Sequence, residues 1–127
     1  MSDETAPDGF AGRLGVAVEK VADGSAHLGF EATAEHLNPA GTVHGGMLAT
    51  LVDATMGAAV RSAVDEEVPA TSQLTLTYLR PGRSGRLLVT AEVRKRGDNL
   101  TVCEAGVEQD GKPLVHALAT FALVGPA

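Results

Sequence analysis

The chain has 127 residues, of which 44% are hydrophobic and 20% are charged, and its formal net charge is −6. This length and composition are typical of one globular domain that buries its own core. The negative charge argues against nucleic acid or an anionic membrane surface as a partner, and the single cysteine excludes an intramolecular disulfide.

The first nine residues, MSDETAPDG, are polar and acidic, so we expect a disordered tail before one domain over residues 10–127. The tail lacks the positively charged start and the apolar stretch of a secretory signal. No apolar run in the chain approaches the length needed to span a membrane. Together with the single cysteine, these features predict a cytoplasmic protein.

Two strands joined by a turn are predicted next. Residues 14–21, LGVAVEKV, alternate in polarity as a strand does, and residues 25–33, SAHLGFEAT, follow in the same way. Asp23 and Gly24 between them form a strong signal for a tight hairpin turn. Residues 34–42 are rich in turn formers, with a proline and a glycine, and break any regular element.

One apolar helix is expected to begin at Gly45 and to end between Arg61 and Val64. No side chain caps it at Gly45, although Thr42 could cap the turn before it. Its apolar residues cover nearly the whole circumference: Met47, Leu48, Leu51, Val52, Ala54, Met56 and Ala59. A helix that is apolar all round is a buried helix.

Further strands complete the predicted fold, separated by turn signals, and Asp110-Gly111 is the turn between the last two. They cover residues 69–79, 85–96, 99–109 and 112–124. The order is therefore two strands, one long helix and then a meander of strands. This order predicts an α+β fold in which a curved antiparallel sheet wraps around one central helix.

Asp53 is the only charged residue between Gly45 and Val60. An ionised carboxylate in apolar surroundings loses solvation unless it finds partners. Asp53 is therefore a structural polar contact, a surface group on a misjudged face, or a working residue. Its Ala, Gly, Leu, Met, Thr and Val neighbours favour a working residue.

The helix begins with the sequence His44-Gly45-Gly46, where backbone N–H groups have no partner inside the helix. Because glycine has no side chain, a ligand oxygen can approach the Gly45 N–H closely. The helix dipole favours negative charge at this end, so the site could act as an oxyanion hole. Alternatively, the two glycines are a packing device and His44 caps or packs the turn.

Gly45 and Asp53 cannot act on one carbonyl group within one chain. They lie about 12 Å apart along the axis and differ by about 80° in direction. If they act together, Gly45 of one subunit meets Asp53 of another. A two-fold dimer with antiparallel helices side by side would form two such sites, and it would also explain a helix that is apolar all round.

Three stretches of the sequence resemble the hotdog-fold acyl-CoA thioesterases, in particular the phenylacetate-degradation (PaaI-type) subfamily. They are NPAGTVHGG at residues 38–46, the acid at Asp53, and TSQLTLTYLRP at residues 71–81. The resemblance covers nearly the whole chain after the tail. It implies the hotdog fold, an active site between subunits, and a homo-oligomer that is a dimer or a tetramer built as a dimer of dimers.

The resemblance also implies a role for each of five residues. The Gly45 N–H would bind the thioester carbonyl oxygen, and Asp53 of the facing chain would act as nucleophile or as general base on water. Asn38 would position the attacking water or the carbonyl, and His44 would orient the thioester. Thr71 matches the position of a hydroxyl near the site. These roles fit the chemistry of thioester hydrolysis.

A cluster of basic residues follows the predicted strand that holds Thr71. Six of the ten Lys and Arg residues belong to it: Arg80, Arg83, Arg86, Arg94, Lys95 and Arg96. The cluster is either a solvated surface or, in part, a site for the nucleotide phosphates of coenzyme A. Arg80, Arg83 and Gly46 are the expected substrate-binding residues.

The remaining chemically active side chains are read as structural. His27, His36 and His116 are scattered and have no zinc-like spacing, so we expect no metal or other cofactor. Cys103 is expected to pack as a small hydrophobic residue. No serine or cysteine lies in a nucleophile-elbow sequence, which argues against a Ser-His-Asp hydrolase.

The implied reaction is hydrolysis of an acyl- or arylacyl-CoA to the free acid and CoA. Hydroxylated phenylacetyl-CoA is the favoured substrate, with medium-chain fatty acyl-CoA and hydroxynaphthoyl-CoA as alternatives. A second hotdog activity, such as hydration of an enoyl-CoA, is disfavoured because no histidine follows Asp53 on the helix. A non-catalytic module that binds CoA or an acyl group is the other alternative.

Overall fold

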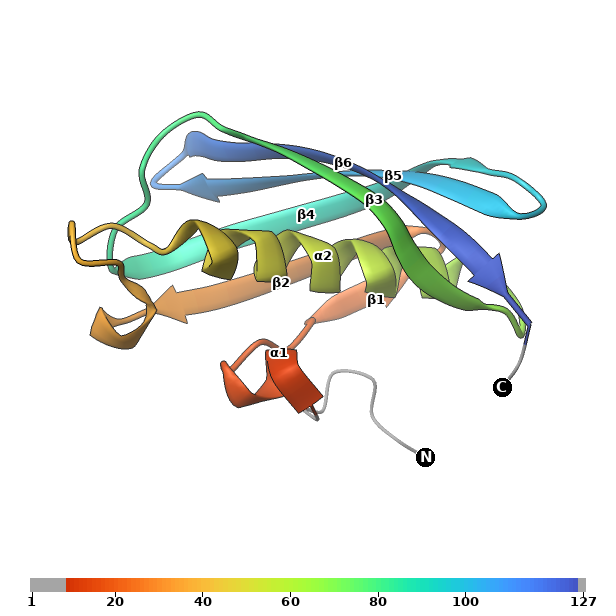
Figure 1. Cartoon of the computed structure of the whole chain (residues 1–127), viewed down its shortest axis with the longest axis horizontal. Coiled ribbons are helices and arrows are strands. Elements are labelled where there is room, and N and C mark those ends of the chain that lie inside the picture. Colours follow the sequence, from red (N-terminus) through yellow and green to blue (C-terminus); the bar gives the residue numbers. More distant parts are fainter. Residues whose placement is uncertain (1–8, 126–127) are drawn as a thin grey trace.

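The structure is a computed structural model that describes residues 9–125 (Figure 1). The predicted tail lies outside these residues, except for Gly9. Gly9 begins a short helix, α1 (Gly9–Arg13), which the sequence did not indicate. The other elements are β1 (Lys20–Ala22), β2 (Ser25–Ala32), the 3-10 turn η1 (Ala34–His36), α2 (Gly45–Ser62), β3 (Val68–Tyr78), β4 (Gly85–Arg96), β5 (Leu100–Gln109) and β6 (Lys112–Val124).

The six strands form one antiparallel sheet in the order β1-β2-β4-β5-β6-β3. The sheet curves, and α2 lies along its inner face (Figure 1). The inward side chains of the strands and one face of α2 make up the hydrophobic core. The predicted α+β fold, a curved antiparallel sheet around one long helix, is therefore confirmed.

Two predicted hairpin turns are confirmed by their backbone conformation. Asp23 and Gly24 have φ angles of 51° and 86°, and Asp110 and Gly111 have φ angles of 52° and 77°. Two successive residues with positive φ form the turn that matches the twist of paired strands. The strands β4 and β6 also have the bounds that the sequence predicted.

The predicted strand over residues 14–21 is wrong for most of its length, because only Lys20–Ala22 pairs with β2. Gly15, with a φ of 84°, turns the chain, and the Val16 N–H bonds back to the Ala11 carbonyl. Val16 and Val18 are buried although they belong to no strand. The alternation of this segment therefore reflects burial without pairing.

Helix α2 ends at Ser62, inside the predicted interval, but the chain covers only one of its faces. The buried residues on that face are Met47, Leu48, Leu51, Val52, Thr55, Met56, Ala59 and Val60. The opposite face carries small residues and Asp53, all at least partly exposed: Gly46, Ala49, Thr50, Ala54, Gly57 and Ala58. The expectation of burial on every side is not met within one chain. None of the described helices has the length and apolarity to cross a membrane.

Candidate active site

The side chain of His44 caps the first turn of α2, which is one of the two roles that the sequence left open for it. The Gly46 N–H donates a hydrogen bond to Nδ1 of His44, over 2.8 Å. His44 is thus the N-cap of the helix, and the expectation of a helix start without a side-chain cap is wrong. Because Nδ1 accepts this bond, the proton of the neutral ring lies on Nε2.

The Gly45 N–H is the unoccupied donor at this end of the helix, since no hydrogen-bond acceptor within residues 9–125 pairs with it. Gly45 borders a pocket of about 340 Å³, whose other lining residues include Val43, Leu48, Tyr78 and Arg80. A carbonyl oxygen entering this pocket would meet a free donor and the positive end of the helix dipole.

Tyr78 is a residue of this site that the sequence reading missed. Its hydroxyl donates a hydrogen bond of 2.8 Å to the Gly45 carbonyl, and its ring lines the pocket beside Gly45. The sequence signal was the alternation of β3, which places Tyr78 on the same face as Leu74 and Leu76, toward the helix.

Asn38 organises the loop that leads into the helix. Its Oδ1 accepts hydrogen bonds from the N–H groups of Ala40 and Thr42, at 3.0 and 3.1 Å. Its Nδ2 donates to the Thr42 hydroxyl over 2.9 Å. These three bonds give Asn38 a structural role in the loop. They leave one amide proton of its side chain for a substrate or a water.

Asp53 is held by Thr71. The Thr71 hydroxyl donates a hydrogen bond of 2.8 Å to Oδ1 of Asp53 and so joins the middle of α2 to β3. Asp53 is only partly buried and lies on the small-residue face of the helix. The structure therefore brings together two residues that the sequence predicted for one site.

A β-bulge directs Thr71 toward the helix. The register of β3 against β6 shifts between Thr71 and Gln73, so that Thr71 faces the buried Phe121. Simple alternation from Tyr78 back along the strand would place Thr71 on the outer face. The extra residue at the bulge reverses this and places Thr71 beside Asp53.

The predicted site residues form two groups within one chain. The first contains Asn38, His44 and Gly45 at the start of α2, and the second contains Asp53 and Thr71. Gly45 and Asp53 lie eight positions apart in a regular helix, which is about 12 Å along the axis. Both groups border β3, the strand at the edge of the sheet.

A second pocket, of about 310 Å³, lies on the other side of the helix start. Its apolar walls come from Phe10, Leu14, Leu37 and Met47, and its polar groups come from Glu35, His36, His44 and Thr50. Gly46 borders this pocket, whereas Gly45 borders the pocket of Tyr78 and Arg80. The helix start therefore has a hollow on each side.

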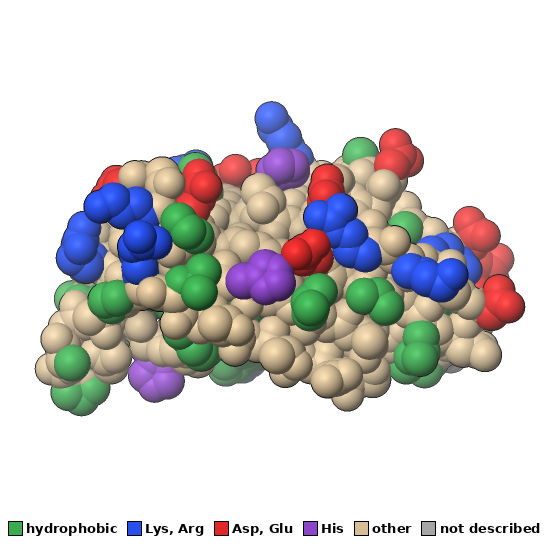
Figure 2. All heavy atoms as spheres, turned by 90° about the horizontal axis from the view of Figure 1, so that it is seen from above, with side chains coloured by type: hydrophobic (Ala, Val, Ile, Leu, Met, Phe, Trp, Pro, Cys, Tyr) green, Lys and Arg blue, Asp and Glu red, His purple; other side chains and the backbone are tan. Residues whose placement is uncertain are grey.

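The predicted basic cluster is dispersed in space. Arg80 lines the pocket beside Gly45 and donates to the Pro113 carbonyl over 3.2 Å. Arg83 lies further along the loop between β3 and β4, and its guanidinium is 4.0 Å from the Asp110 carboxylate. The other ion pairs of the cluster join Arg86 to Glu19, Arg94 to Glu92 and Glu104, and Arg96 to Glu67. Figure 2 accordingly shows Lys and Arg in separate groups among Asp and Glu side chains.

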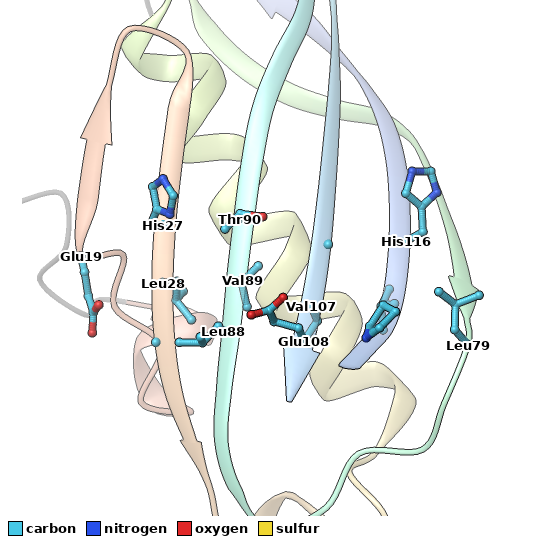
Figure 3. A pocket seen from close by; sticks show the side chains of 14 residues that line it. Glu19, His27, Leu28, Leu79, Leu88, Val89, Thr90, Val107, Glu108 and His116 are labelled. Atoms are coloured by element: carbon cyan, nitrogen blue, oxygen red, sulfur yellow. The ribbon is translucent and has the colours of Figure 1, made fainter. Parts of the chain in front are cut away.

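A hollow of about 580 Å³ lies on the outer face of the sheet, away from α2 (Figure 3). His27 on β2 and His116 on β6 lie at its sides, and Leu88 and Glu108 line it. Asp53 and Gly45 do not border it, so it is separate from the candidate chemistry.

Beside this hollow, Glu104 joins two neighbouring strands. Its carboxylate lies 2.7 Å from Nε2 of His116 on β6 and 2.6 Å from Nε of Arg94 on β4. The hydrogen bonds from His116 and then from Arg94 hold the pKa of Glu104 below its ordinary value. His116 thus has a structural partner, in agreement with the sequence interpretation.

Two other side chains are also structural. Nδ1 of His36 accepts a hydrogen bond from the Thr33 N–H and closes the η1 turn. Cys103 is fully buried, and burial raises the pKa of its thiol to about 11, so it is protonated and unreactive at neutral pH. Within residues 9–125, no three His, Cys, Asp or Glu side chains gather as a metal ion would require.

The chain is similar to known proteins in sequence. The sequence model of the thioesterase superfamily matches residues 40–116. VNG_1336C of Halobacterium salinarum is 42% identical over 100 residues, which are 74% of this chain and 66% of that protein. Human acyl-coenzyme A thioesterase 13 is 37% identical over 68 residues, 52% of this chain and 48% of that protein. The chain thus spans about half to two thirds of the length of these relatives.

Solved structures agree with the fold. The conserved protein PA5202 of Pseudomonas aeruginosa superposes with a TM-score of 0.92 at 28% identity, over 98% of this chain and 100% of that one. A phenylacetic acid degradation-related protein of Ralstonia eutropha JMP134 superposes with a TM-score of 0.82 at 34% identity, over 90% and 88% of the two chains. The fold is the hotdog fold, and the chain belongs to the thioesterase superfamily.

Proposed function

We propose that the protein is an acyl-CoA thioesterase of the phenylacetate-degradation subfamily, which hydrolyses an acyl- or arylacyl-CoA to the free acid and CoA. The observation that carries the proposal is the hydrogen bond between Thr71 and Asp53. It holds the only carboxylate of α2 in a fixed direction, on the helix face that the chain leaves uncovered. Membership of the thioesterase superfamily supports thioester hydrolysis as the reaction.

The active site forms across a two-fold axis between two copies of the chain. Strand β3, eleven residues long, pairs only with β6 among the described strands, so its other edge is open to a second copy. The uncovered face of α2 consists mainly of Gly, Ala and Thr, which lets a second helix approach closely. A partner paired at β3 would place its own α2 beside this face.

The contacts of β3 predict where the axis passes. Tyr78 marks the start of α2 through its bond to Gly45, and Thr71 marks the level of Asp53. If Gly45 of one protomer meets Asp53 of the other, Tyr78 must come level with Thr71 of the facing strand. The axis then crosses β3 midway between them, near Thr75.

The site then has the groups that thioester hydrolysis needs. Asp53 accepts a proton from water, and the oxygen of that water bonds to the thioester carbon while the carbonyl oxygen becomes an oxyanion at the Gly45 N–H. The intermediate collapses with cleavage of the carbon–sulfur bond, and Asp53 returns the proton to the CoA thiolate. In the alternative route the Asp53 carboxylate itself bonds to the carbonyl carbon, the carbon–sulfur bond breaks, and CoA leaves as the thiolate. Water then hydrolyses the mixed anhydride to the free acid and regenerates the Asp53 carboxylate, and the released proton passes to the CoA thiolate.

The two hollows at the helix start suit the two parts of the substrate. Arg80, beside Gly45, forms no ion pair within residues 9–125 and is the better candidate of the two arginines for a CoA phosphate. Arg83 faces Asp110, which weakens its claim. The pocket at Gly46 is apolar at Phe10 and Met47 and has polar groups at Glu35 and His36.

An arylacyl group with a hydroxyl substituent matches this pocket, so hydroxylated phenylacetyl-CoA is the proposed substrate. The similarity to the Ralstonia protein supports this choice. Medium-chain fatty acyl-CoA and hydroxynaphthoyl-CoA are the alternatives that a substrate panel would detect. We further propose a homotetramer built as a dimer of dimers and a cytoplasmic location.

Hydrolysis of a panel of acyl-CoAs, followed with a thiol-reactive dye, tests the proposal. Asp53→Asn should lower kcat by about 10²- to 10⁴-fold, because the substituted amide cannot accept the proton of water. Binding of CoA by calorimetry should be unchanged. Equal turnover by the variant would contradict the catalytic role, and CoA binding without hydrolysis by the wild type would indicate a binding module.

A further inference from the structure

Two successive peptide groups form the start of α2, and each is held in a different way. The first joins His44 to Gly45, and its carbonyl accepts hydrogen bonds from the N–H groups of Met47 and Leu48, at 2.9 and 3.1 Å. In a trans peptide the N–H points opposite to the carbonyl. The Gly45 N–H is therefore directed out of the helix.

The second peptide group joins Gly45 to Gly46 and is held from both sides by side chains. Its carbonyl accepts the hydrogen bond of the Tyr78 hydroxyl, and its N–H donates to Nδ1 of His44. Both bonds are 2.8 Å long. The contact from Tyr78 comes from β3 and so ties the helix start to the sheet.

These two hydrogen bonds matter because the first turn of α2 contains two glycines in succession. Glycine has the largest backbone freedom of all residues, so two glycines in succession weaken the order of a helical turn. A first turn of this composition frays easily, and fraying would turn the Gly45 N–H away from a bound carbonyl. A hydrogen bond from a sheet strand opposes that motion.

We propose that Tyr78 is a positioning residue that keeps the Gly45 N–H aligned as the oxyanion donor. The inference rests on the proposed thioesterase function. The Tyr78 side chain is 51% exposed and contributes no large burial to the core. Its hydroxyl therefore acts mainly through Gly45. In a two-fold dimer, each β3 strand would hold the donor of one site through Tyr78 and the acid of the other through Thr71.

Steady-state kinetics of Tyr78→Phe test the proposal. We expect kcat to fall by about 10-fold, because the oxyanion exists only in the transition state, and KM to change by less than about 2-fold. Thr77→Val is the matched control, since it removes a hydroxyl from the adjacent exposed position of the same strand, and it should leave both constants unchanged. Unchanged kcat for Tyr78→Phe would overturn the proposal.

A double-mutant cycle with Gly45→Pro separates positioning from a general structural role. Proline is favoured at the first position of a helix, and His44 already has the extended conformation that a following proline requires, with φ −57° and ψ 132°. A Cβ atom at Gly45 would lie 3.4 Å from the Tyr78 hydroxyl, which is an ordinary contact. The substitution removes the N–H and leaves the carbonyl in place.

In the Gly45→Pro background, Tyr78→Phe should change kcat by less than about 2-fold, because no donor remains to be positioned. An equal 10-fold loss in both backgrounds would show a structural effect and overturn the proposal. Asp53→Asn in the same assay tests the proposed function separately. If that variant keeps full turnover, the assignment of Asp53 fails while the cycle still decides the role of Tyr78. Absence of hydrolysis by the wild type would contradict both the proposed function and the positioning role of Tyr78.

Discussion

The sequence indicates Asp53 and Thr71 as site residues, and the structure shows that they are in contact. The composition of α2 singles out Asp53, because one carboxylate among small and apolar residues needs a partner. The partner could not be predicted from alternation, since Thr71 reaches the helix only because of the bulge between Thr71 and Gln73. Only the family resemblance indicated Thr71, and it did not predict the hydrogen bond from Thr71 to Asp53 that the structure shows.

The Thr71 hydroxyl is expected to orient Asp53 for catalysis. Thr71→Val should lower kcat by about 10-fold, because the carboxylate loses its hydrogen-bonded partner and samples other rotamers. Thr71→Ser keeps the hydroxyl and should retain most of the activity. Equal kcat values for the valine and serine variants would contradict an orienting role of Thr71.

His44 and Tyr78 show the limit of sequence reading at this scale. The sequence placed His44 at the site but left open whether it caps the turn, because a capping bond depends on the ring orientation. Tyr78 alternates with the threonines of β3, but its hydrogen bond to Gly45 depends on how β3 crosses the start of α2. That crossing is a tertiary property with no local sequence signal.

At the scale of elements, the sequence predicted the long helix and every strand after it closely. Strands β4 and β6 alternate over most of their length and are bounded by Gly or by Asp-Gly turns, which mark both their period and their ends. Residues 14–19 alternate equally well but have no paired strand. Alternation reports which side chains face the core, whereas pairing depends on neighbours that are distant in sequence.

Glu104 ties β4, β5 and β6 together, and its contribution to stability should depend on pH. Its folded-state pKa is lowered by His116 and Arg94, so its stabilising effect is present at neutral pH and is lost as pH falls through the folded pKa. Glu104→Gln should therefore lower Tm at pH 7 by about 1–3 °C, since the pair is at the surface.

The Tm difference between wild type and Glu104→Gln should shrink as the pH is lowered from about 5 into the acid range, where the carboxyl of the wild type is protonated. Thermal unfolding followed by circular dichroism at several pH values measures this. A difference that stays constant down to acid pH would contradict the linkage.

At the scale of the whole molecule, the single chain leaves two surfaces uncovered. The small-residue face of α2 and the outer edge of β3 are both uncovered by the described residues. The sequence indicated the first feature as a helix that is apolar all round, and a second chain was expected because Gly45 and Asp53 cannot meet within one helix. The open edge of β3 could not be predicted, because strand order depends on long-range pairing.

Cysteine cross-linking tests the proposed two-fold axis near Thr75. Gln73, Thr75 and Thr77 alternate with the inward residues of β3 and lie on its outer side. In an antiparallel pair the residue at the axis faces its own copy, within reach of a disulfide. Thr75→Cys should therefore form a covalent dimer on mild oxidation. Gln73→Cys and Thr77→Cys should not, since two residues off the axis already separates the copies by about 13 Å.

The native thiol should not interfere with this test, because Cys103 is buried and its pKa is raised to about 11. Denaturing electrophoresis without reductant gives the readout. A protein that stays monomeric at all three positions would contradict pairing through β3.

The central claim, that each active site takes Gly45 from one protomer and Asp53 from the other, is tested most directly by mixed dimers. Asp53→Asn and Gly45→Pro homodimers should each be nearly inactive. Heterodimers of the two, purified by separate tags, should recover about half of the wild-type kcat, because one of their two sites has both native groups. Heterodimers as inactive as the parent homodimers would show that the two residues do not act across the interface.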